Sequence, residues 1–243
     1  MKTLIKKQLT LLLLSCLFIA TTHAQWKKVK GNGNSTTVKR TTSDYNAINC
    51  SGSMDFILVK GTEGQITLQG DENLLDYIVT EVKNGALIVK VKNGVSLKTS
   101  FNNTIKITIP FEDIEGVSLS GSGDLYSNDV IVASSLDVAL SGSGDVVLDI
   151  KTESVESALS GSGDITLKGS TNNLETKVSG SGDFHGFDLQ ANNTEVAVAG
   201  SGDAKVVSNT MLKARVSGSG DIRYHGNPER EDTKVAGSGS ISN

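Results

Sequence analysis

The chain is poor in cysteine. Among 243 residues only Cys16 and Cys50 occur. Cys16 lies in an N-terminal apolar stretch, so a chain that loses this stretch keeps only Cys50 and forms no intrachain disulfide. We interpret Cys50, which lies beside apolar residues, as a small buried side chain rather than a reactive thiol. Stability must then come from a hydrophobic core, and a mature length of about 219 residues suits one elongated domain or two small ones.

Aromatic residues and catalytic motifs are also scarce. Aromatic residues make up 5% of the chain, Trp26 is the single tryptophan, and Tyr126 and Tyr224 stand isolated. The sequence contains no H-E-x-x-H, no C-x-x-C pair, no P-loop and no G-x-S-x-G. Cleavage of a polysaccharide needs two carboxyl groups at one place in different environments, whereas the acids of the repeat recur at even intervals. We therefore predict no catalytic residue and no enzyme, with a carbohydrate-active enzyme as the alternative.

A relay of Ser181, Asp183 and His185 can be drawn from the sequence. Triads are recognised by their geometry, and a chain rich in serine offers these residue types together by chance. We do not interpret the three residues as catalytic.

The first 24 residues read as a secretory signal peptide. Lys2, Lys6 and Lys7 precede the mostly apolar stretch Leu9–Ala20, and Ala24 ends a small-residue cleavage site. The stretch is too short for a convincing membrane span. We predict export to the periplasm, the outer surface or the medium, and no membrane span.

A lipoprotein signal is the competing interpretation of this segment. Leu13–Cys16 resembles a bacterial lipobox, whose cysteine becomes a lipidated N-terminus. Apolar residues continue past Cys16, which favours the plain signal peptide over anchoring through Cys16.

The chain has little net charge, and the charge is negative. The formal charge is -4, and it becomes -7 when the signal peptide leaves, because three lysines and no acids are lost. An acidic exported domain has no electrostatic attraction to nucleic acid. We predict no nucleic-acid partner.

A glycine-rich pentapeptide recurs instead. SGSGD occurs five times, with the variants AGSGD, AGSGS and SGSMD, and consecutive copies from residue 120 onward are 18 to 21 residues apart. Such a period is typical of stacked-repeat proteins. The copies are Ser51–Asp55, Ser120–Asp124, Ser141–Asp145, Ser160–Asp164, Ser179–Asp183, Ala199–Asp203, Ser217–Asp221 and Ala236–Ser240.

The columns around the repeat predict strands. The residue after each aspartate and the residue five before it are apolar in every copy from residue 120 onward, as in Leu159 and Ile165, with small or polar residues between them. This alternation has the period of a strand, and the paired glycines argue against helix. Neighbouring strands of an up-and-down barrel run in opposite directions, so identical copies of one motif would not align there. A coil that advances one rung per repeat places identical positions directly above one another. The sequence predicts an all-β parallel β-helix (solenoid) with rungs of about 19 residues.

The pentapeptide then forms a corner between two strands of one rung. The alternation runs through it and places both glycines on the inward side, with the serines and the aspartate outward. Glycine suits a tight bend where no side chain fits. Ser170–Asn173 and Ala191–Thr194 supply a second, looser turn. The corner glycines are Gly121, Gly123, Gly142, Gly144, Gly161, Gly163, Gly180, Gly182, Gly200, Gly202, Gly218, Gly220, Gly237 and Gly239.

The N-terminal half is less regular. We predict a polar leader or cap over 25–45, irregular β rungs over 46–115, and regular rungs over 116–243, with a separate small β-sandwich as the alternative for the middle segment. Asp71–Tyr77 is predicted to form a short helical turn. Asn84-Gly85 and Asn93-Gly94 are hairpin signals.

The outward aspartates are the sharpest candidate site. Stacked carboxylates about 5 Å apart repel each other. Either Ca²⁺ compensates for this repulsion, or each carboxylate accepts backbone N–H groups at the corner. We favour the second interpretation and predict no cofactor, with Ca²⁺ as the alternative, because the spacing differs from the Ca²⁺-binding nonapeptide. The aspartates are Asp124, Asp145, Asp164, Asp183, Asp203 and Asp221.

Two further features predict partners. The serines of the repeat form exposed hydroxyl columns suited to a repetitive surface such as a glycan or ice, and the adjacent acids argue against ice. The last rung ends at Ile241–Asn243 with no obvious cap, so its edge invites strand pairing with a second copy. We predict a glycan or cell-envelope partner and a homodimer.

Three stretches together resemble a known family. Gly70–Gly94, Ile105–Leu125 and the tandem SGSGD rungs are similar to the head GIN domain, the adhesin head of auto-transporters in exported proteins of Bacteroidetes-type bacteria. The resemblance covers roughly 37–240 and implies a right-handed β-helix of unestablished molecular function, with no catalytic residues. No translocator barrel follows before Asn243, so we do not expect a complete auto-transporter.

These observations predict an exported, non-catalytic surface or periplasmic β-helix module. It would act as an adhesin head, a binding module or a structural protein. The alternatives are a carbohydrate-active enzyme and a Ca²⁺-dependent assembly module.

Overall fold

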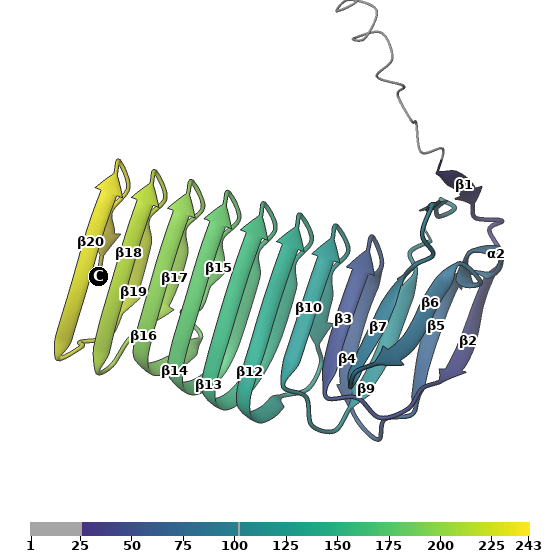
Figure 1. Ribbon diagram of the computed structural model, residues 1–243, viewed down its shortest axis with the longest axis horizontal. Coiled ribbons are helices and arrows are strands. Elements are labelled where there is room, and N and C mark those ends of the chain that lie inside the picture. Colours follow the sequence, from purple (N-terminus) through teal and green to yellow (C-terminus); the bar gives the residue numbers. More distant parts are fainter. Residues whose placement is uncertain (1–25, 102) are drawn as a thin grey trace, which may run out of the picture.

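The protein is a parallel β-solenoid whose strands stack along its long axis (Figure 1). The computed structural model describes residues 26–101 and 103–243. About seven turns with rungs of about 19 residues make up the coil, which confirms the prediction of an all-β solenoid. The predicted signal peptide, with Cys16, lies outside the described residues. No helix among the described residues is long and apolar enough to cross a membrane.

Each regular rung runs along one face of the coil, turns at the SGSGD corner and returns along the opposite face. The strands of both faces belong to one continuous sheet. Identical positions of successive repeats pair in parallel, as in Leu119 with Leu140 and Leu140 with Leu159. The strands of these rungs are β10 (Gly116–Gly121), β11 (Leu125–Ser127), β12 (Ile131–Gly142), β13 (Val146–Gly161), β14 (Ile165–Gly180), β15 (Phe184–His185), β16 (Leu189–Gly200), β17 (Ala204–Val207), β18 (Met211–Gly218), β19 (Ile222–His225), β20 (Arg230–Gly237) and β21 (Ile241–Ser242).

The core lies inside the coil, between its two faces, and consists of the apolar columns. Leu159 and Ile165, on either side of one corner, are buried, and so are their equivalents in most other rungs. Burial of such side chains is the main source of stability, at about 25 cal/mol per Å² of apolar surface. In the last rung Val235 is 43% exposed and Ile241 is half-buried, because only one neighbouring rung covers them.

The N-terminal segment extends both faces of the coil and covers its end. β3 and β4 pair in parallel with β10 and β11, which places Cys50 beside Leu119 and Phe56 beside Leu125. Cys50 is buried, as interpreted from the sequence. Antiparallel pairs of β2 with β5, β5 with β9 and β6 with β7 complete the cap. Its elements are β1 (Lys27–Lys30), β2 (Ser35–Thr41), β3 (Ala47–Gly52), β4 (Asp55–Lys60), β5 (Gln65–Asp71), α2 (Glu72–Leu75), β6 (Ile78–Lys83), β7 (Ala86–Val91), β8 (Val95–Lys98) and β9 (Lys106–Phe111).

Of the three turns predicted for this segment, the helical turn and the first hairpin are confirmed, and the second hairpin is wrong. The helical turn is α2, and Asn84 and Gly85, both with positive φ, close the β6–β7 hairpin. Asn93-Gly94 does form a turn, with Gly94 at φ 75°, but it closes no hairpin. Both edges of β7 are already paired, with β3 and β6, so β8 pairs with β1 instead.

Candidate functional site

The SGSGD corner is where successive rungs touch most closely. Gly161 has φ 134°, and a Cβ added to it would overlap the backbone carbonyl of Gly142 in the preceding rung. A Cβ on Gly163 would overlap the carbonyl oxygen of Gly144 in the same way. Gly163 is buried and Gly161 is half-buried. The glycines therefore permit contact between rungs along the axis, whereas the sequence suggested only a bend toward the core.

Backbone hydrogen bonds join these corners. The N–H groups of Ser162 and Gly163 both donate to the carbonyl oxygen of Gly142, at 2.8 and 3.1 Å. The same pair of bonds occurs in every corner from Ser122 to Gly239. Each first glycine of the motif, up to the next-to-last rung, thus accepts two bonds from the next rung.

Two of the three variant copies of the motif, SGSMD and AGSGS, lie in the first and last corners of the stack. Met54 takes the position of the second glycine in the first corner, where its side chain is 2% exposed, and Gly123 packs on its backbone. No corner of this motif precedes it, so a side chain fits there. Ser240 replaces the aspartate in the last corner of this chain, and its N–H and hydroxyl both donate to Asp221.

The aspartates form a ladder of hydrogen bonds between rungs. Oδ1 of Asp164 accepts the backbone N–H of Asp183 at 2.8 Å, and the equivalent bonds measure 2.7 to 3.1 Å. We expected acceptance within the corner itself, whereas each bond reaches the next rung. The donor and acceptor pairs are Asp145 to Asp124, Asp164 to Asp145, Asp183 to Asp164, Asp203 to Asp183, Asp221 to Asp203 and Ser240 to Asp221.

This ladder leaves fewer free oxygen atoms at the corners for a Ca²⁺ ion. Ca²⁺ takes six to eight oxygen ligands, but one oxygen of each ladder carboxylate and many corner carbonyls already accept backbone N–H groups, as the carbonyl of Asp145 does from Leu125. In the SGSMD copy, the pKa of Asp55 is raised, first by partial burial and second by the negative charge of Asp124. Neighbouring carboxylates raise each other's pKa in this way because like charges repel.

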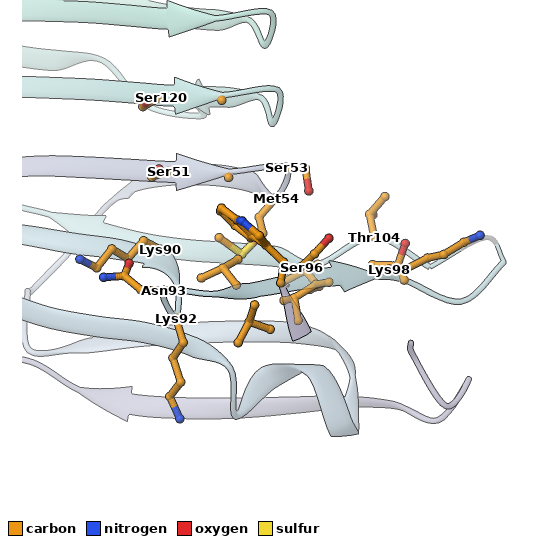
Figure 2. Close-up of a pocket in the computed structure, with 18 residues that line it drawn as sticks. Ser51, Ser53, Met54, Lys90, Lys92, Asn93, Ser96, Lys98, Thr104 and Ser120 are labelled. Atoms are coloured by element: carbon orange, nitrogen blue, oxygen red, sulfur yellow. The ribbon is translucent and has the colours of Figure 1, made fainter. Parts of the chain in front are cut away.

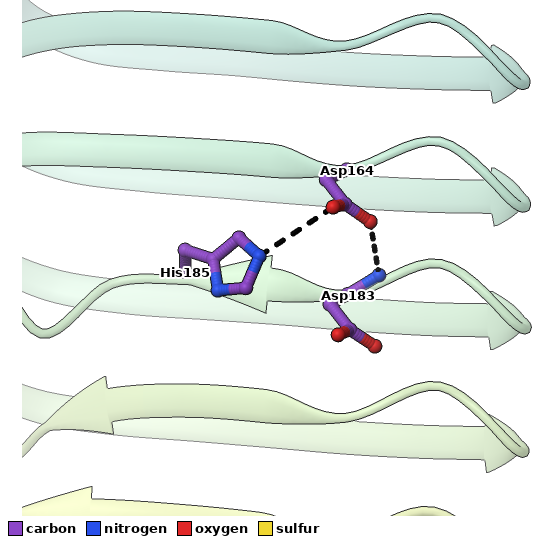
Figure 3. A group of neighbouring side chains, drawn as sticks. All are labelled: Asp164, Asp183 and His185. Carbon is purple, nitrogen blue, oxygen red and sulfur yellow. Dashed lines mark hydrogen bonds and ion pairs between the residues drawn. The ribbon is translucent and has the colours of Figure 1, made fainter.

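One rung brings a histidine to the ladder (Figure 3). His185 Nε2 lies 3.5 Å from Oδ2 of Asp164, and ligand atoms of these two residues and Asp183 all lie within 4.8 Å of one another. The cluster offers one nitrogen and two oxygens at a half-exposed surface. Ser181 is exposed and forms no hydrogen bond with His185 among the described residues, so the relay drawn from the sequence is not assembled.

The looser turn at the opposite side carries a second set of repeating polar contacts. Asn172 donates to Glu153 at 2.9 Å, Asn192 donates to Asn172 at 2.7 Å, and Asn193 donates to Asn173 at 2.9 Å. We call this set, with Ser135 and Ser154, which share a hydrogen bond, the polar ladder. The sequence located the turn at Ser170–Asn173 but missed the ladder, because its members are 19 or 20 residues apart and meet only through the register of the rungs.

Two shallow hollows flank the polar ladder. One, of about 350 Å³, lies beside a column of acids that includes Glu156, Glu175 and Glu195. The other, of about 410 Å³, is lined by Lys151, Gln190 and neighbouring turn residues. Carboxylates, amides and hydroxyls thus alternate along several rungs of one surface.

Comparisons with known proteins agree with this architecture. The family model described as "Putative auto-transporter adhesin, head GIN domain" matches residues 44–228. No curated protein matches the chain.

Several crystal structures are similar to the chain, and three of them illustrate the range. A putative lipid binding protein from Parabacteroides distasonis is 29% identical with a TM-score of 0.75, covering 89% of this chain and 99% of its own. A putative adhesin from Parabacteroides merdae is 26% identical with a TM-score of 0.68, covering 89% and 98%. A putative adhesin from Bacteroides fragilis is 22% identical with a TM-score of 0.80, covering 88% and 99%, and supports the fold alone.

Proposed function

Because this chain belongs to the head GIN domain family, we propose that it is an exported, non-catalytic head that binds a glycan of the cell envelope. The observation that carries this function is the polar ladder, in which amides, hydroxyls and carboxylates recur on one rigid surface. The adhesin names of the family and of its relatives support a surface-binding role.

The polar ladder suits a repetitive ligand. Its groups recur at the strand spacing of about 4.8 Å, so a polymer lying along the axis meets the same donors and acceptors at every rung. Asn172 and Asn192 each have further donor or acceptor capacity toward solvent. The rigid stack lowers the ordering cost of binding, since few side chains must be immobilised.

The evenly repeated acids support binding rather than cleavage. Glycoside hydrolysis uses one carboxyl group with a raised pKa beside one that stays ionised. Glu156, Glu175 and Glu195 instead occupy equivalent positions in successive rungs, which gives them similar surroundings.

A glycan array combined with hydrolysis assays tests this function. We expect envelope polysaccharides to be retained without product. The double variant Asn172→Ala/Asn192→Ala should lose binding at least about tenfold, since several hydrogen bonds are worth more than 1.4 kcal/mol. The matched control, Ser143→Ala/Ser162→Ala at the opposite corner, should bind as the wild type does. Product formation, or equal loss in both variants, would overturn the proposal.

Export follows the signal peptide read from the sequence, with the lipid anchor on Cys16 as the alternative. Mass analysis of the mature protein separates them. Release of a chain that begins at Gln25 supports the plain signal peptide, and a lipidated Cys16 supports the anchor.

Two copies associate through β20. Among the described residues this strand pairs with β18 alone. All eight of its residues are exposed, and Val235 presents an apolar side chain at 43% exposure. A strand with one unpaired edge is a template for a second chain. Light scattering should give the mass of a dimer at high protein concentration, and a constant monomer mass would contradict the association.

A further inference from the structure

A pocket of about 690 Å³ lies at the N-terminal end of the stack (Figure 2). Its walls come from the first corner, Ser51–Met54, from the end of β7, from β8, and from Trp26, which is 59% exposed. It is separate from both the aspartate ladder and the polar ladder.

The lining of this pocket has the opposite charge to the chain. Lys90, Lys92 and Lys98 line the pocket, and Figure 2 shows their ammonium ends directed outward around its rim. The lining contains no aspartate or glutamate, in a chain whose formal charge is -4. The remaining lining is largely apolar or hydroxylic, and it includes Leu97 and Ile105. Three cations beside apolar side chains, without a compensating acid, suit an anion that also carries an apolar part.

The first corner, which lines this pocket, also differs from the later corners in the hydrogen bonding of two backbone N–H groups. In the next corner the N–H groups of Ser122 and Gly123 both donate to the carbonyl oxygen of Gly52, at 3.0 and 2.9 Å. Their equivalents one rung earlier, in Ser53 and Met54, form no hydrogen bond with any residue that the structure describes.

The path of β7 explains why these two groups have no such partner. β7 pairs with β3 only as far as the Val89–Cys50 contact, and the chain then leaves the rung before it reaches the corner. The place where the later corners hold a carbonyl oxygen therefore faces the pocket that Gly52, Ser53 and Met54 line.

We propose that this pocket binds an anionic amphiphile, a fatty-acid carboxylate or a lipid phosphate monoester. An acidic oxygen takes the place of the carbonyl at the N–H groups of Ser53 and Met54, as anions do at paired backbone donors. The lysines neutralise the charge, and the acyl chain packs against Trp26 and the apolar lining. This site goes beyond the glycan-binding function and uses different residues, so each can fail without the other.

Tryptophan fluorescence measures the binding, because Trp26 is the only tryptophan. Dodecanoate and dodecyl phosphate, used below their aggregation concentrations, distinguish the two anion sources, and dodecanol serves as the neutral control. We expect a saturable change in Trp26 emission with at least one anion and none with dodecanol. No change with either anion, or an equal change with dodecanol, would overturn the proposal.

Amide NMR tests the two N–H groups directly. The amide signals of Ser53 and Met54 should shift on titration with the anion that binds, while those of Ser122 and Gly123, already bonded to a carbonyl, should not. Shifts at all four amides, or at none, would refute the role of the first corner.

Paired variants test the charge. Lys90→Gln/Lys98→Gln should weaken binding about tenfold, as the loss of two nearby charges in water predicts. Lys60→Gln/Lys168→Gln, which removes two lysines outside the lining, should leave it unchanged. Circular dichroism shows whether each variant is folded. Equal affinity of the first pair and the wild type, or equal loss in both pairs, would contradict the assignment.

Discussion

At the scale of single residues, two buried hydroxyls stand out. Ser157 and Thr176 occupy one inward column, and neither hydroxyl has a hydrogen-bond partner within residues 26–101 and 103–243. Val138 and Val196 hold the same column in neighbouring rungs. A buried hydroxyl without a partner carries a desolvation cost that a methyl group does not.

Thr176→Val should therefore raise the free energy of unfolding by about 1 kcal/mol, measured by urea denaturation. Thr194 is the matched control, because its hydroxyl donates to the carbonyl of Val207 at 2.7 Å in the core. Thr194→Val should lower the free energy of unfolding by about 1 kcal/mol. A loss of stability in Thr176→Val would show that its hydroxyl does have a partner.

The core residues could be predicted from the sequence, whereas the reason for the corner glycines could not. Alternation of apolar residues was enough to place Leu159 and Ile165 in the core, since strand periodicity alone decides which face they occupy. It did not predict why Gly161 and Gly163 are glycines, because their constraint is the backbone of another rung.

At the scale of elements, the aspartate ladder stabilises the stacking of corners. We expect Asp164→Asn to keep near wild-type stability, because its side-chain oxygen still accepts the N–H of Asp183. Asp164→Ala should lower the free energy of unfolding by about 0.5–1.5 kcal/mol, measured by thermal or urea denaturation.

Calorimetry with Ca²⁺ should give no heat for the wild type. A saturable heat that Asp164→Asn abolishes would show that the ladder is a metal site.

The cap depends on Asp71, which is buried where β5 ends. Its carboxylate accepts bonds from the N–H and hydroxyl of Ser100, the N–H of Gly33 and the side chain of Asn103, at 2.7 to 3.0 Å. The pKa of Asp71 is lowered, mainly by the backbone hydrogen bond from Ser100 and further by the other hydrogen bonds. Burial of the carboxylate opposes this effect but is smaller. The folded state thus favours the ionised form.

This pKa predicts a pH dependence. A lowered folded pKa contributes stability that is present above the unfolded value of about 3.9 and is lost as the pH falls through the folded pKa. Asp71→Asn should lower the melting temperature by several degrees at pH 7 and lose less stability than the wild type between pH 5 and pH 3. Parallel curves for the two proteins would contradict this role.

Some elements could be predicted and others could not, for a physical reason. The hairpin at Asn84-Gly85 has a local signal in two residues that tolerate positive φ. The parallel pair of β1 and β8 has no such local signal, because its paired residues are 68 positions apart in the sequence. They meet only once the rest of the chain has folded. The polar ladder was missed for the same reason.

At the scale of the whole molecule, each rung contacts mainly its neighbours. Deleting Ile165–Asp183 removes one rung and joins Asp164 to Phe184, so every remaining column keeps its phase. This variant should fold, with a melting temperature within several degrees of the wild type.

A deletion one residue shorter is the control. Removing 165–182 places Asp183 in the core column of Ile165 and reverses the faces of the strand that follows. This variant should be unfolded or insoluble by circular dichroism and gel filtration. Equal folding of both deletions would contradict the stacking of columns as the basis of the fold.

We propose that the solenoid binds an envelope glycan along the polar ladder without cleaving it. The most direct test is a titration of the labelled protein with soluble envelope polysaccharide, followed by amide NMR. We expect an intact polysaccharide and unchanged signals at the SGSGD corners. The signals that should shift are those of Glu153, Asn172, Asn173, Asn192 and Asn193. Shifts confined to the SGSGD corners, no shifts at saturating polysaccharide, or the appearance of cleaved product would contradict it.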